Sequence, residues 1–149
     1  MIAKQCYFDR PEVKFMPGAL VGKTDLNDNS FFGLMYISAG SIDMLSKASG
    51  GSDNQYFSKI HIWGGSLESG ELILRNIGTQ QSNGLTYGFV GSFTIGGSAK
   101  LRGAPGVKVY LRTNSQLFVF GELTMEQSST FVFDPRPIVR HVRTQLRSP

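Results

Sequence analysis

Residues 116–125 read QLFVFGELTM, two apolar runs of strand-forming residues joined by the single glycine Gly121. A tight β-hairpin needs about two loop residues or more, so one glycine between two strands does not suit a reversal of the chain. A glycine with unusual backbone angles can instead turn a corner without reversing the direction of the chain. We therefore predict a corner at Gly121, where the chain bends from one face of a stack to the next.

Gly121 opens the last of four similar phrases, in which a glycine is followed by Ser or Glu, an apolar residue, a variable residue, and Leu or Met. Their glycines lie 30, 27 and 24 residues apart, and the phrases are Gly40–Met44, Gly70–Leu74, Gly97–Leu101 and Gly121–Met125. A phrase that returns every 20 to 50 residues or so indicates stacked repeats. We expect a short strand in each phrase, at Ile42–Leu45 in the first, and an aromatic, β-branched strand after the loop that follows.

The composition also favours a turn-rich all-β chain. Of 149 residues, 18 are glycine and 11 are phenylalanine, and these types are enriched in turns and strands respectively. Within residues 107–112, alternation places Val107, Val109 and Leu111 on one side of a strand. We divide the chain into an N-terminal arm or cap (1–30, with a strand at Val13–Met16), a β core (31–134) and a basic C-terminal tail (135–149).

Residues 92–101 and 117–125 resemble coils of the β-solenoid, or β-helix, repeat proteins of phage particles and bacterial adhesins. The likeness covers roughly residues 31–134, and its motif is short and degenerate. It implies an architecture: an all-β, solenoid-like stack of about four irregular coils, with an extended N-terminal arm and a basic C-terminal tail. A jelly-roll β-sandwich is the alternative, because it too consists of many short strands with glycine turns.

The net charge of +4 resides entirely in the tail. Residues 1–135 hold 11 basic and 11 acidic groups, and the excess comes from Arg136, Arg140, Arg143 and Arg147. At spacings of 4, 3 and 4 these arginines form one helical stripe, and a second is formed by Ile138, Val139, Val142 and Leu146. We predict a short amphipathic helix, or a strand, whose guanidinium groups bind carboxylate or phosphate on a partner. A frayed, solvated basic tail is the alternative.

No catalytic group, metal site or cofactor is predicted. A single cysteine, Cys6, excludes a cysteine-based metal cluster, and the chain has no phosphate-binding, zinc-finger or RNP signature. His61 alternates with Ile60 and Ile62, so we expect it on the outer face of a strand beside Trp63. The variable phrase position holds no row of carboxylates, since it contains Asp43, Ile73, Lys100 and Thr124.

Glu71 and Glu122 recur one place after their glycines, two coils apart. With a rise of about 4.8 Å per coil they would lie about 9.6 Å apart. That separation could suit the two carboxylates of a glycosidase, but we interpret them as solvated corner residues.

The sequence leads us to expect a non-enzymatic virion structural protein made in the host cytoplasm. The N-terminus lacks the apolar core of a signal peptide, and no run reaches about 18 apolar residues, so no membrane contact is expected. The first choice is a phage capsid decoration (cement) protein, a homodimer or homotrimer that binds major capsid or other virion proteins through its termini, without sequence-specific nucleic-acid binding. Alternatives are a phage tail or fibre component, a filament-forming solenoid, and a carbohydrate-binding or carbohydrate-active module that uses Trp63, Tyr87 and Tyr110.

Overall fold

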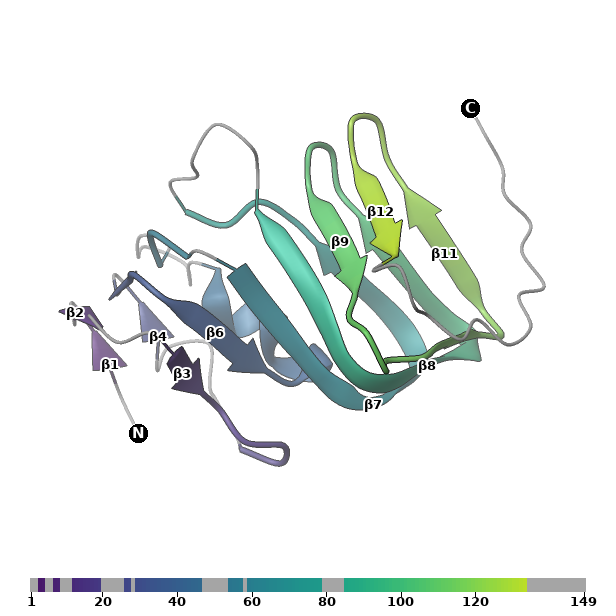
Figure 1. Ribbon diagram of the computed structural model, residues 1–149, viewed down its shortest axis with the longest axis horizontal. Helices are drawn as coiled ribbons and strands as arrows, with labels where there is room; N and C mark the ends of the chain where they lie inside the picture. Colours follow the sequence, from purple (N-terminus) through teal and green to yellow (C-terminus); the bar gives the residue numbers. More distant parts are fainter. Residues whose placement is uncertain are drawn as a thin grey trace.

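In the computed structural model, the chain winds into a stack of about four parallel β-coils (Figure 1). The structure describes residues 3–4, 7–8, 12–19, 26–27, 29–46, 54–57, 59–78 and 85–133. Every strand pair within these residues is parallel. The predicted solenoid is therefore confirmed over the jelly roll, whose strands pair antiparallel.

One sheet runs the length of the stack. Its strands are, in order, β12 (Thr130–Phe133), β9 (Lys108–Leu111), β8 (Thr86–Gly103), β7 (Lys59–Leu74), β6 (Leu34–Ile37) and β3 (Glu12–Lys14). The second half of β8 also pairs with β10 (Leu117–Val119) and β11 (Glu122–Met125). Two short pairs join β1 (Ala3–Lys4) to β4 (Leu26–Asn27) and β2 (Tyr7–Phe8) to β5 (Ser30–Phe31).

The core forms because the register stacks apolar residues on one another. Met35, Ile60, Tyr87 and Val109 are successive partners along the sheet, and each is at most 1% exposed. The predicted alternation in residues 107–112 is confirmed, since the side chains of its odd-numbered positions are buried and those between them face outward. Strand β3 lies near the predicted strand at Val13–Met16 and adds a parallel partner to β6.

The corner at Gly121 is confirmed, but the predicted reason for it is wrong. Strands β10 and β11 on either side of it both run parallel to β8, so the chain bends without reversing. Gly121 does not adopt a left-handed φ. Instead, a Cβ there would overlap the carbonyl oxygens of Ala99 and Gly96 on the coil below. Glycine is required because two backbones approach closely, not because the backbone angles are unusual.

The first phrase forms a helix and not the predicted strand. Residues Ala39–Leu45 make a 3₁₀ helix, η1, which buries Ala39, Ile42 and Leu45. These three residues are spaced by three, and a 3₁₀ helix has three residues per turn, so all of them lie on the face toward the core. The spacing of apolar residues in this phrase therefore fits a helix turn better than it fits alternation.

Two buried asparagines join the coils next to η1. Asn29 and Asn54 are both inaccessible to solvent. Asn54 Oδ1 accepts hydrogen bonds from the backbone N–H and the side-chain amide of Asn29, each at 3.1 Å, and Asn54 Nδ2 donates to Leu45 O at 2.8 Å. Buried polar groups are costly when unpaired, so these bonds fix the path of the chain at this corner.

Within the described residues, no helix is long and apolar enough to cross a membrane.

Replacing Gly121 with alanine should strongly destabilise the fold, whereas the same change at Gly97 should not. The added methyl at residue 121 meets fixed backbone oxygens, while a Cβ at Gly97 has nothing within 4 Å and no left-handed φ to oppose it. We expect Gly121→Ala to lower the free energy of unfolding by about 3 kcal/mol or more, as overpacking does at rigid sites. Urea unfolding of both variants measures this, and equal stability of the two would contradict the close-approach account.

Candidate functional site

An aromatic cluster lies on the outer face of the long sheet. Tyr36, His61, Gly88 and Tyr110 are successive register partners on β6, β7, β8 and β9. Because Gly88 has no side chain, the Tyr110 ring lies across it and its hydroxyl hydrogen-bonds to His61 Nε2. A Cβ on Gly88 would stand 2.6 Å from that hydroxyl oxygen. The glycine therefore creates the space in which the tyrosine and the histidine meet.

Tyr36 and Trp63 complete the cluster on its N-terminal side. The Tyr36 ring meets His61 edge-on, with centroids 4.8 Å apart, and stacks on Trp63 at 4.9 Å. Trp63 Nε1 donates a hydrogen bond of 2.7 Å to Phe15 O. Lys14 Nζ lies 5.0 Å from the Tyr36 ring centroid, a distance suited to cation–π attraction. The predicted neighbourhood of His61 and Trp63 on the outer face is confirmed, but the cluster leaves His61 only 4% exposed.

His61 is held in its neutral form. Its pKa is lowered to about 4, first because burial penalises the imidazolium and then because Arg112 and Lys59 are positively charged, while Glu12 opposes the shift. Nδ1 is buried and has no hydrogen-bond partner among the described residues. A general base that works near neutral pH needs a pKa near 7, so the geometry and the pKa of His61 favour a packing role.

The predicted trio of Trp63, Tyr87 and Tyr110 does not come together. Trp63 and Tyr110 belong to the outer cluster, but Tyr87 is 0% exposed and its side chain lies in the core. Its hydroxyl donates a 2.6 Å hydrogen bond to Arg75 O, and burial raises the pKa of the phenol. Tyr87 therefore cannot contact a bound sugar.

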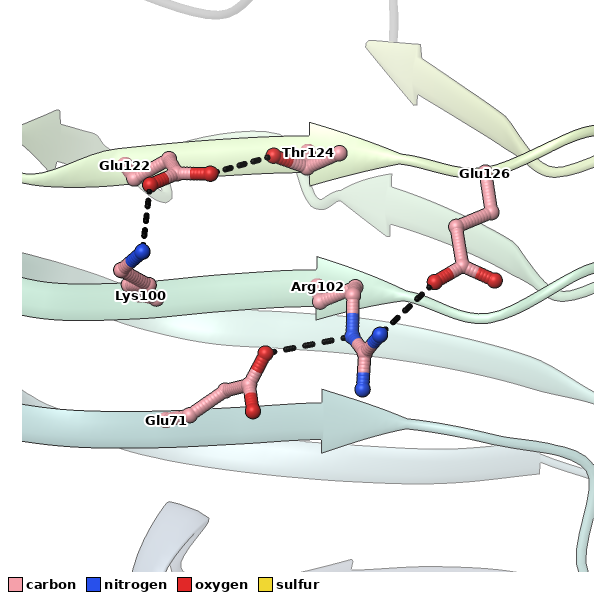
Figure 2. A network of polar contacts seen from close by, with 6 residues as sticks. All are labelled: Glu71, Lys100, Arg102, Glu122, Thr124 and Glu126. Atoms are coloured by element: carbon pink, nitrogen blue, oxygen red, sulfur yellow. Dashed lines mark hydrogen bonds and ion pairs between the residues drawn. The ribbon is translucent and has the colours of Figure 1, made fainter.

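A network of charged and polar side chains crosses the outer face formed by β7, β8 and β11 (Figure 2). We call it the charged ladder, and it consists of Glu71, Lys100, Arg102, Glu122, Thr124 and Glu126. Lys100 pairs in register with both Glu71 and Glu122, so a cation stands between the two carboxylates that were predicted to lie two coils apart. Lys100 Nζ lies 3.0 Å from Glu122 Oε2. The predicted alignment of Lys100 with Ile73 and Thr124 is wrong, because Arg102 occupies that row.

Arg102 joins the remaining acids of the ladder. Its Nε lies 3.2 Å from Glu71 Oε1, as an ion pair without a hydrogen bond, and its Nη1 donates to Glu126 Oε1 at 3.1 Å. Thr124 Oγ1 donates to Glu122 Oε1 at 3.1 Å. Each acid thus faces a cation or a hydroxyl and not the other acids. Since the side chains are about 30–60% exposed, each pair contributes only about 0.2–1 kcal/mol.

Sequence reasoning missed an apolar surface at the end of the stack. We call residues 117–133, which contain β10, β11 and β12, the end coil; among the described residues each of these strands has a partner strand on one side only. Figure 1 shows them at the yellow-green end of the stack. Three of its large apolar residues are exposed, with fractions of 72%, 52% and 49%: Phe120, Val132 and Phe133. The signal in the sequence is that no further glycine phrase follows Gly121–Met125.

The four tail arginines, Arg136, Arg140, Arg143 and Arg147, lie outside the described residues, so their partner-binding role stays a prediction. Among the residues that the structure does describe, no three His, Cys, Asp or Glu side chains are grouped so that they could hold a metal ion. Among the described residues, the aromatic cluster, the charged ladder and the end coil are three candidate surfaces for function.

The lowered pKa of His61 predicts a loss of stability in acid. The unfolded chain binds a proton near pH 6.5 and the folded chain only near pH 4, so stability falls as pH drops through this window. We expect a loss of roughly 1–3 kcal/mol by pH 4. Thermal unfolding between pH 7 and 4 should show a shallower decline in His61→Gln, while His141→Gln, the change at the other histidine, should behave as the parent. Identical pH profiles for all three proteins would contradict this assignment.

Replacing Gly88 with alanine should open the aromatic cluster. The new methyl displaces the Tyr110 ring, which lets water reach His61 and weakens the burial that lowers its pKa. We expect the His61 pKa to rise toward 6.5, as measured by NMR titration of the imidazole. Gly97→Ala, on the same strand with open space around it, is the control. An unchanged titration in Gly88→Ala would show that Tyr110 does not cover the histidine.

Comparison of the chain with protein-family models, with curated proteins and with solved structures finds no match. The parallel coils that the sequence pattern implied are nevertheless present. The likeness to β-helix proteins of phage particles and bacterial adhesins is one of architecture.

Proposed function

We propose that the protein is a non-enzymatic structural component of a virus particle. The role that we propose first is that of a phage capsid decoration protein. The observation that carries this proposal is the exposed apolar surface of the end coil, at Phe120, Val132 and Phe133. These three side chains belong to the last described coil, and large exposed apolar side chains at the end of a stack are candidates for contact with another protein. In this role the stack is a rigid spacer whose ends contact neighbouring subunits.

The charged ladder and the aromatic cluster support a spacer role because many of their polar groups already have partners within the described residues. The acids of the charged ladder contact Lys100 and Arg102. In the aromatic cluster the rings pack on one another, and the Trp63 N–H donates a hydrogen bond to a backbone carbonyl. Contacts with a particle therefore fall to the ends and to the basic tail, whose guanidinium groups suit an acidic capsid surface.

A test is co-sedimentation of the purified full chain with virus particles isolated from the source that encodes this sequence. We expect binding that weakens with salt, because charge attraction is screened. A variant with Arg136, Arg140, Arg143 and Arg147 all changed to Gln should bind at least about tenfold more weakly, as the loss of several paired arginine contacts implies.

The matched control changes four exposed basic residues of the body, Lys14, Lys59, Lys100 and Lys108, to Gln and so removes the same charge. If both quadruple variants bind equally, the tail arginines have no specific role. If the parent chain does not sediment with particles at all, the virion proposal fails. Immunogold labelling of bound particles separates a head position from a tail or fibre position.

A carbohydrate-binding role is favoured by a different observation from the predicted trio. The rings of Phe32 and Tyr56 stack with their centroids 5.0 Å apart, and the two residues are 44% and 50% exposed. Tyr56 has a φ of 63°, a left-handed conformation that is costly for a large residue and is often found at functional sites. Glycan-array binding that is lost in Tyr56→Ser and kept in Phe120→Ser would favour this second function.

A further inference from the structure

The outer face of the long sheet holds three cations that form no ion pair among the described residues. Along β9, Lys108, Tyr110 and Arg112 face outward, since the residues between them are buried. Lys59 of β7 reaches the same place, with its Nζ 5.8 Å from the centroid of the Tyr110 ring. The ion pairs of the described residues include neither these two lysines nor Arg112. This face therefore carries positive charge that no described carboxylate neutralises.

Acidic groups are scarce on the same face. Among its described residues the acid is Glu12 of β3, which lies 2.5 Å from Lys14 Nζ. The effect reaches the histidine between these groups: after burial, the charges of Arg112 and Lys59 lower the pKa of His61, and Glu12 opposes them. The face is thus positive, although the chain before its tail has equal numbers of basic and acidic groups.

Partly exposed aromatic rings lie among these cations. Trp63 and Tyr110 each keep part of their surface accessible to solvent. The Tyr110 ring lies across Gly88, so its other side faces outward, where the long and exposed Lys59 side chain lies over it. Trp63 is held in place by stacking on Tyr36 and by its hydrogen bond to a backbone carbonyl. The face thus combines fixed rings with exposed cations.

We propose that this face binds single-stranded nucleic acid without regard to sequence. We call it the basic face and define it by Lys59, Trp63, Lys108, Tyr110 and Arg112. The Cα atoms of Lys108 and Arg112, four residues apart on an extended strand, are about 13 Å apart, so a chain of phosphates suits the pair better than a single phosphate does. Bases stack on Trp63 and Tyr110, and such stacking tolerates any sequence because every base has a flat face.

The arrangement favours a single strand over a duplex and over an acidic polysaccharide. In a duplex the bases are stacked on one another, which leaves Trp63 and Tyr110 without a partner. An acidic polysaccharide satisfies the cations but has no aromatic plane to offer to the rings. Cations that track a phosphate backbone beside rings that stack on bases are the combination found in proteins that bind single strands. This inference goes beyond the virion role and does not depend on it.

The fluorescence of Trp63 tests the contact directly, because it is the one tryptophan of the chain. We expect oligothymidylate and oligouridylate of about 15 nucleotides to quench this fluorescence in the purified full chain, and the two probes distinguish DNA from RNA. Dextran sulfate, which has charge but no bases, should leave it unquenched. Equal quenching by dextran sulfate, or no quenching by either oligonucleotide, would overturn the proposal.

A charge-neutral variant of the basic face provides an independent readout. It combines three exposed substitutions: Lys59→Gln, Lys108→Gln and Arg112→Gln. We expect labelled oligothymidylate to bind this variant at least about tenfold more weakly. The slope of log K against log salt should become shallower by about 2, because each lost phosphate contact of a single strand removes about 0.7.

The matched control removes the same charge outside the basic face. It combines three substitutions in the other ion pairs: Arg75→Gln, Lys100→Gln and Arg102→Gln. Near physiological salt, where charges are screened beyond about 8 Å, it should bind as the parent does. Equal weakening in both triple variants, or weakening only when the four tail arginines are changed to Gln, would show that the basic face is not the binding site.

Discussion

The whole stack depends on the hydrogen-bonded register between β7 and β8. These strands, of 16 and 18 residues, pair from Ile60–Tyr87 to Leu74–Gly103. Strand β6 pairs with one of them, and β9, β10 and β11 pair with the other. Because both strands bend together round the stack, they determine the cross-section that each other coil must follow.

Small irregularities in that register decide which side chains meet. Ile60 pairs with Tyr87, 27 positions on, whereas Glu71 pairs with Lys100, 29 positions on. Two register shifts, between Trp63 and Gly65 and between Leu67 and Ser69, account for the difference. They displace the third glycine phrase by two residues, and Lys100 thereby comes into line with acids instead of Ile73. The alignment of Glu71 with Lys100 in the charged ladder therefore results from these two register shifts.

The same details show what the sequence could and could not predict. Alternation and the single-glycine corner predicted parallel coils, because both reflect local chain geometry that any coil must satisfy. The strand predicted at Ile42–Leu45 was wrong because apolar residues three apart also suit a 3₁₀ turn. The burial of His61 could not be predicted, since it depends on Tyr110, 49 residues away, and on the space above Gly88. The register shifts leave no recognisable pattern in the sequence, so the partners of Glu71 and Glu122 could not be predicted from it either.

Parallel pairing throughout gives the molecule a direction, since its first and last coils present different surfaces. Contact between like ends joins two copies related by a twofold axis and then stops. Contact between unlike ends repeats without closing and produces a filament. Whatever covers the end coil therefore also determines whether copies of this protein form closed, discrete assemblies or an open polymer.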